Sequence, residues 1–70
     1  MKVNKTQALL YIITVLYEKG HFRRIEILQE VEISDLTFRR YMQELRAFFS
    51  NFMIDKNIRY NREDDTYYLD

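Results

Sequence analysis

The spacing of apolar residues changes after Asn57, and this change limits the folds that the chain can adopt. Before it, apolar residues recur every three or four positions. After it, Ile58 and Tyr60 lie two residues apart, as do Tyr67 and Leu69, with a polar, turn-prone stretch between the two pairs. The first spacing is typical of amphipathic helices, and the second is typical of strands that bury one face. The sequence therefore predicts a mainly α chain with a small β-hairpin over about 58–69.

Capping residues indicate where the first helix begins and ends. Asn4 suits the N-cap, and Gln7, three residues later, suits its capping-box partner. The helix is expected to run from about Lys5 to Lys19, because Gly20 is free to take the left-handed conformation that ends many helices. Residues 21 and 22 are expected to form a short extended link.

Two further helices follow this link. The second is expected over about Arg24 to Val31, and Ser34 is a strong N-cap candidate for the third, which runs from about Asp35 to Phe49 or Asn51. Two helices joined by three or four residues make a helix-turn-helix layout. With one helix before it and a hairpin after it, the expected fold is a three-helix winged helix-turn-helix.

The helical spacing also predicts the core. We expect it to contain Leu9, Ile12, Ile13, Leu16, Ile25, Leu28, Phe38, Met42, Leu45, Phe49 and Phe52, with the hairpin docking Ile58, Tyr60, Tyr67 and Leu69 on the helices.

The first helix carries more apolar surface than a local core can cover. Leu10 and Tyr17 widen its apolar face on one side, and Ala8 and Val15 widen it on the other. A large exposed apolar patch usually marks an interface. We therefore expect a homodimer through this helix, or a partner domain that packs there. The alternative is that the hairpin and residues 49–54 fold back over both flanks.

The composition excludes several classes of function. The 70 residues suffice for a single domain, residues 1–70, and they contain no Cys, no Pro, one Gly and one His. These counts leave no disulfide, no thiolate metal site and no glycine-rich phosphate loop. No nucleophile–base pair is recognisable either. We expect no enzyme, no catalytic residue, no cofactor and no metal site.

The sequence also bears on location. The longest nearly apolar run, from Ala8 to Tyr17, is about half as long as a membrane span of ~20 residues. The N-terminus shows no signal-peptide cleavage site, and a chain without cysteine suits a reducing compartment. We expect a cytoplasmic protein that does not enter a membrane.

Residues 33–45, which read Ile-Ser-Asp-Leu-Thr-Phe-Arg-Arg-Tyr-Met-Gln-Glu-Leu, resemble the recognition-helix signature of the DNA-binding domains of DeoR-type and WYL regulators. Residues 58–69 are similar to the wing of the same family. Tyr41 stands where the family has an acidic residue, and Thr66 stands where its wing has a glycine. The resemblance implies a transcriptional regulator that binds double-stranded DNA in a sequence-specific way. It also implies a C-terminal effector domain, which these residues do not include.

The third helix offers groups that suit DNA. Its outer face at about 35–50 carries three Arg and a Gln with no acid among them, and such side chains read guanine and adenine edges in the major groove. The wing at 58–69 would lie alongside. The candidate DNA-binding residues are Arg23, Arg24, Ser34, Asp35, Leu36, Thr37, Arg39, Arg40, Gln43, Arg46, Arg59 and Arg62.

Each part of this surface has a plainer interpretation. The arginines of the third helix can be solvated groups paired with nearby acids. Arg23 and Arg24, at the start of the second helix, can bind a phosphate or pair with Glu26 or Glu30. The acidic wing tip at 63–65 would repel phosphate, so the wing can serve only to stabilise the fold.

Two functions therefore compete. The basic outer face of the third helix favours DNA binding. Equal numbers of basic and acidic residues, 11 of each, and the broad apolar face of the first helix favour a winged helix that binds proteins or dimerises without DNA.

Overall fold

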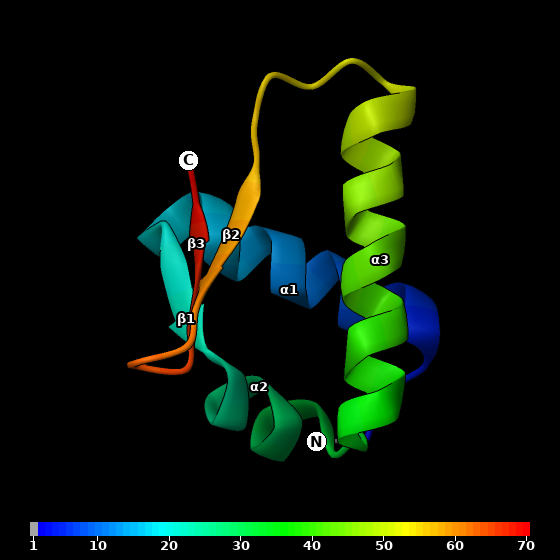
Figure 1. The fold of residues 1–70 in the computed structure, drawn as a ribbon. Coiled ribbons are helices and arrows are strands. Elements are labelled where there is room, and N and C mark those ends of the chain that lie inside the picture. Colours follow the sequence, from blue (N-terminus) through cyan, green and yellow to red (C-terminus); the bar gives the residue numbers. More distant parts are fainter. Residues whose placement is uncertain (1) are drawn as a thin grey trace.

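The computed structural model describes residues 2–70, which form three helices and three short strands (Figure 1). The elements in chain order are α1 (Lys5–Lys19), β1 (His21–Arg23), α2 (Arg24–Val31), α3 (Asp35–Asn51), β2 (Ile58–Asn61) and β3 (Thr66–Leu69). In Figure 1, α3 stands beside the sheet, α1 passes behind both, and α2 lies beneath. The predicted fold class, mainly α with a small hairpin in a winged-helix arrangement, is confirmed.

The predicted helix ends are confirmed because the capping residues act as expected. The Asn4 side chain accepts a hydrogen bond from the Gln7 backbone N–H at 2.8 Å, and the Ser34 hydroxyl accepts one from the Thr37 backbone N–H at 3.2 Å. Gly20 ends α1 in the left-handed region at φ 81°. These local contacts satisfy backbone groups that a helix end would otherwise leave unpaired.

The sheet has three strands rather than two, because the expected extended link at residues 21 and 22 also pairs with another strand. Residues 21–23 form β1, which pairs antiparallel with β3, and β3 also pairs antiparallel with β2 in the order β1-β3-β2. Phe22 and Tyr60 are therefore the neighbours of Tyr67 on its two sides. A strand of three residues is too short to show a period, and its partner lies far along the chain.

An aromatic cluster of Phe22, Phe38 and Tyr67 joins α3 to the sheet. The Phe38 ring meets Phe22 at 6.1 Å and Tyr67 at 5.4 Å, both edge-on, while Phe22 and Tyr67 are stacked at 5.5 Å. Around it lies the core, formed by Ala8, Ile12, Leu16, Phe22, Ile27, Val31, Phe38, Met42, Leu45, Phe49, Ile58 and Tyr67. The cluster explains how a small sheet is held on the helices.

The predicted core is wrong at Ile25 and incomplete in α2. This helix buries Ile27 and Val31, whereas Ile25 is 38% exposed and Leu28 is half-buried. Four apolar residues in a helix of eight residues fit more than one face, so spacing alone did not decide which face packs inward.

Phe52 is the second error, because it is 70% exposed. It lies at the C-cap of α3, where the helix projects beyond the sheet (Figure 1). Tyr60, also expected in the core, is 38% exposed. Leu9, Ile13 and Leu69 are only partly buried.

The two flanks of α1 differ. On one flank Ala8 is fully buried and Val15 is partly buried, so the core covers that side. On the other flank Leu10 is 60% exposed and Tyr17 is 51% exposed.

Within residues 2–70, no helix combines the length and the apolar character that a membrane crossing requires.

Candidate nucleic-acid interface

The outer face of α3 is the most basic surface that the helix presents. Leu36 is 60% exposed there, and the side chain of Arg39 is 71% exposed. Arg40 and Gln43 are also exposed. Among residues 2–70, neither Arg40 nor Gln43 has a side-chain hydrogen bond or ion pair, so both are available to a ligand.

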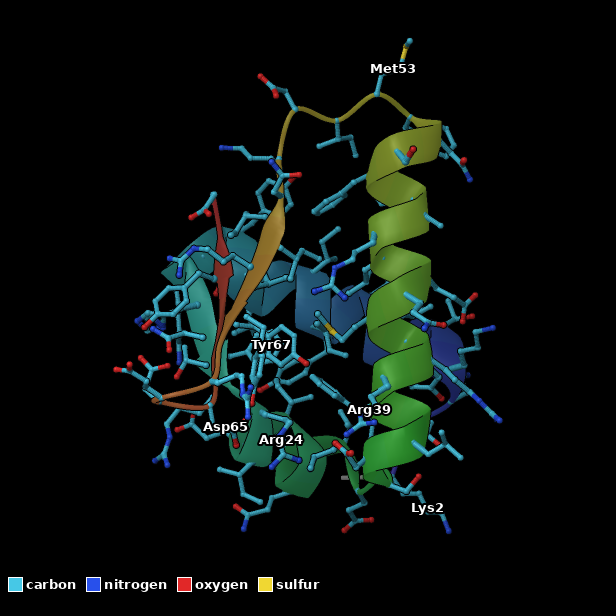
Figure 2. All side chains as sticks on the ribbon, viewed as in Figure 1. Lys2, Arg24, Arg39, Met53, Asp65 and Tyr67 are labelled. Carbon is cyan, nitrogen blue, oxygen red and sulfur yellow. The ribbon has the colours of Figure 1, made fainter. Side chains whose placement is uncertain are left out.

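A groove of about 480 Å³ lies between α3 and the sheet. Figure 2 shows Arg39 on α3 and Arg24 on α2 reaching toward this side of the molecule, near Tyr67 and Asp65. The residues that line the groove are Arg24, Asp35, Arg39, Met42, Gln43, Arg46, Tyr60 and Tyr67. Five of them are predicted DNA-binding residues, which the fold has brought together from α2 and α3.

Arg24 connects three elements at the lower end of this groove. Its Nε lies 2.9 Å from Asp65 Oδ1 and its Nη1 lies 3.0 Å from Asp35 Oδ1. Its backbone N–H also donates to the Asp65 carbonyl oxygen at 2.9 Å. The hydrogen bond with Asp65 and the charges of both carboxylates raise the pKa of Arg24, against the opposing effect of burial. Arg24 thus pairs with acids of the wing and of α3, which the sequence did not indicate.

Asp65 is the wing residue that completes this junction. It adopts a left-handed conformation at φ 53° and also accepts a hydrogen bond from the Tyr60 hydroxyl at 2.6 Å. The hydrogen bond from Arg24, followed by the one from Tyr60, lowers the pKa of the Asp65 carboxyl. The hydrogen bond between Tyr60 and Asp65 also raises the pKa of Tyr60. The sequence placed Tyr60 in a strand and Asp65 in a turn-prone stretch, but it gave no signal for their contact or for the one between Asp65 and Arg24.

The acidic wing tip is therefore partly neutralised by internal contacts. Besides Asp65, the carboxylate of Asp64 accepts a hydrogen bond from the Tyr68 hydroxyl at 2.7 Å. This bond is the first cause of the raised pKa of Tyr68. Glu63 is exposed. Of these contacts, only the ion pair of Asp65 with Arg24 offsets a negative charge, because the Tyr68 hydroxyl is neutral.

Two further arginines border the groove with protein acceptors. Arg39 Nε lies 3.1 Å from Asp35 Oδ2, one turn earlier on α3. Arg46 Nη2 donates to the Ile58 carbonyl oxygen at 3.2 Å. Asp35 thus stands between Arg24 and Arg39 and holds both guanidinium groups at the N-terminal end of α3.

The wing arginines do not join this cluster. Arg59 Nε lies 3.0 Å from Asp70 Oδ2, and its guanidinium stacks over the Tyr68 ring at 4.7 Å. Because side chains alternate along a strand, Arg59 lies on the opposite face of the sheet from Tyr60. Arg62 is exposed in the turn between β2 and β3.

The remaining predicted residues act locally. Ser34 caps α3, and its hydroxyl donates to Thr37 Oγ1 at 3.1 Å. The Arg23 backbone N–H donates to Glu26 Oε1 at 3.2 Å, which caps the start of α2.

Within residues 2–70, no group of three or more His, Cys, Asp or Glu side chains is placed to hold a metal ion.

Comparisons of the chain with protein-family models, with curated proteins and with solved structures found no match.

Proposed function

We propose that this chain binds double-stranded DNA in a sequence-specific way as a transcriptional regulator, with α3 in the major groove and the β2–β3 wing alongside. The observation that carries this proposal is the exposed face of α3, where Arg40 and Gln43 have no protein partner among residues 2–70. Arginine pairs with guanine edges and phosphates, and glutamine pairs with adenine. The resemblance of residues 33–45 to DeoR-type and WYL recognition helices supports the same function.

The contacts assign the basic and polar residues to two roles, DNA contact and positioning. Arg39, Arg40 and Gln43 face solvent and would contact DNA, with Arg39 or Gln43 reading bases and Arg40 mainly gripping phosphate. Arg39 would exchange its exposed contact with Asp35 for a DNA group, because exposed ion pairs contribute little. Arg24 is a positioning residue, since its bonds to Asp35 and Asp65 fix the wing against the start of α3.

Fluorescence anisotropy with a labelled duplex tests the proposal across a salt series. A sequence enriched from a random duplex library serves as the specific target. Arg39→Ala should cost roughly 1–3 kcal/mol of specific binding free energy if this side chain reads a base. Arg40→Ala should weaken binding to all duplexes alike and reduce the salt slope by about one phosphate unit.

Lys19→Ala provides the control for the loss of one positive charge, since Lys19 lies in the last turn of α1. This variant should bind like the parent. If Arg39→Ala and Arg40→Ala also bind like the parent, or if the parent binds no duplex at low salt, the proposal is wrong.

The second candidate function is a protein-interaction module without DNA binding. The exposure of Leu10 and Phe52, 60% and 70%, favours it, because exposed apolar groups gathered on one face suit a protein partner. Failure to bind duplex at low salt would select this function.

We propose that the DNA-binding form is a cytoplasmic homodimer. One recognition helix reads few base pairs, whereas a two-fold pair reads two half-sites about 34–36 Å apart. A C-terminal effector domain, which the family resemblance implies, is the other candidate partner. We assign no enzymatic activity or cofactor.

A further inference from the structure

We propose that a second copy of this chain packs, about a two-fold axis, on the apolar face that α1 shares with the C-terminal half of α3. We call this surface the α1–α3 face, and it comprises Leu9, Leu10, Ile13, Tyr17, Phe48 and Phe52. It gives the proposed homodimer a surface that includes α3 and excludes the Ala8 and Val15 flank. Its test uses no DNA, so it can fail while the DNA-binding proposal stands.

Four members of this face are exposed, while Leu9 and Ile13 are partly buried. Leu10 is 60% exposed, Tyr17 51%, Phe48 40% and Phe52 70%. The Phe48 ring lies 5.2 Å from that of Phe52 and 5.9 Å from that of Phe49, and Phe49 in turn meets Tyr17 at 6.5 Å. Tyr17 and Phe48 thus flank the buried Phe49 ring, and Leu10 and Phe48 line one groove, so the exposed apolar residues lie next to one another across two helices.

The face contains both a hollow and the side chains that can fill it. A groove of about 410 Å³ runs between α1 and α3. Its apolar lining is Leu9, Leu10, Ile13, Leu45 and Phe48, and its polar lining is only Thr6 and Glu44. A two-fold interface must be complementary to itself. Leu10 lines the groove and is still 60% exposed, so about a two-fold axis the Leu10 of one copy can pack against the groove of the other.

The spacing along α1 suits a second helix. Thr6, Leu10, Ile13 and Tyr17 follow one another at intervals of four, three and four residues, which is the spacing of a seam between two packed helices. Ala8, Ile12 and Leu16 already serve the chain's own core. The seam is therefore a second stripe on α1, in which Leu10 and Tyr17 stay exposed while Ile13 packs partly against the core.

The charges at the edge of the face permit an identical partner. Lys5 Nζ lies 2.7 Å from Glu44 Oε2, so the two charges beside the groove neutralise each other within one copy. A two-fold axis brings like groups of the two copies close together, and an unpaired charge there would repel its own copy. This internal pair removes that repulsion.

The position of the face leaves the Arg39 and Gln43 side of α3 free. At about 100° per residue, Phe48 lies roughly 180° around the helix from Arg39 and 140° from Gln43, whereas Arg40 lies nearer, at roughly 80°. The domain measures 30 × 28 × 22 Å, so two copies in contact place equivalent points at separations comparable with one turn of DNA, about 34 Å. An ordinary interface needs about 800 Å² from each partner, a modest share of the total surface of 5052 Å².

Leu10 and Leu36 form a matched pair for the test, since both are 60% exposed and lie on different faces. Sedimentation equilibrium from about 1 to 100 µM should show the parent passing from 8.7 kDa to twice that mass. Leu10→Lys should weaken this association at least about tenfold, and Leu36→Lys should leave it unchanged. Circular dichroism checks that both variants remain folded.

A second measurement locates the contact directly. Because the chain has no cysteine, Leu10→Cys and Leu36→Cys each supply a single site for a spin label. Pulsed dipolar spectroscopy should give a defined short distance between copies for the Leu10 site and not for the Leu36 site. A parent that stays at 8.7 kDa at every concentration overturns the proposal, as does a dimer that Leu36→Lys disrupts as readily as Leu10→Lys.

Discussion

Replacing Phe38 by leucine tests whether the aromatic cluster holds the sheet on the helices. Phe38 is fully buried, and the change removes its edge-on contacts with Phe22 and Tyr67 while keeping most of the apolar volume. Each such ring pair contributes about 0.5–1.5 kcal/mol beyond the buried area. The free energy of unfolding should therefore fall by roughly 1–3 kcal/mol, a large part of what a domain of this size possesses.

Phe52→Leu is the matched control, because Phe52 is 70% exposed and its ring meets that of Phe48, which is itself exposed. This variant should change the free energy of unfolding by less than about 0.5 kcal/mol. Urea unfolding followed by circular dichroism measures both variants, at a protein concentration that keeps the chain monomeric. Equal losses for Phe38→Leu and Phe52→Leu would refute the assignment of the core.

Two more predictions follow from backbone and side-chain geometry. The lowered pKa of Asp65 stabilises the fold above about pH 4, and this contribution is lost as the pH falls through the lowered value. Asp65→Asn should thus lower the melting temperature at about pH 6, and its difference from the parent should shrink progressively as the pH falls below about 4. Met53 is 91% exposed and has φ 53°. Met53→Gly should raise the free energy of unfolding by roughly 0.5–1 kcal/mol, and Met53→Ala, which keeps the strained backbone, should not; urea titration distinguishes them.

The helices could be predicted from the sequence because their ends depend on local contacts. Asn4, Gly20 and Ser34 each act on backbone groups within a few residues, so their effect can be read without the fold. The strand β1 could not be predicted. Its pairing depends on residues 66–68, more than 40 positions away, and no local pattern reports such a partner.

The candidate site, like the fold, could be predicted from the sequence only in part. The exposed row of Arg39, Arg40 and Gln43 follows from helical periodicity, and the structure leaves these side chains exposed. The junction of Arg24 with Asp35 and Asp65 joins α2, α3 and the wing. The sequence made Arg24 and Asp35 candidate DNA-binding residues and placed Asp65 in the acidic wing tip. Their pairing depends on the fold, so the sequence could not predict it.

The place of β3 in the sheet has a consequence for synthesis on the ribosome. β3 is the middle strand, yet it is the last of the three to be translated, and β1 pairs with it alone. Until Leu69 leaves the exit tunnel, β1 and β2 have no partner, and Phe22 and Phe38 lack the Tyr67 ring. The nascent chain can form its helices early, but the aromatic core must close in one late step. A stalled ribosome-bound chain should therefore become resistant to protease only once residues beyond β3 fill the tunnel.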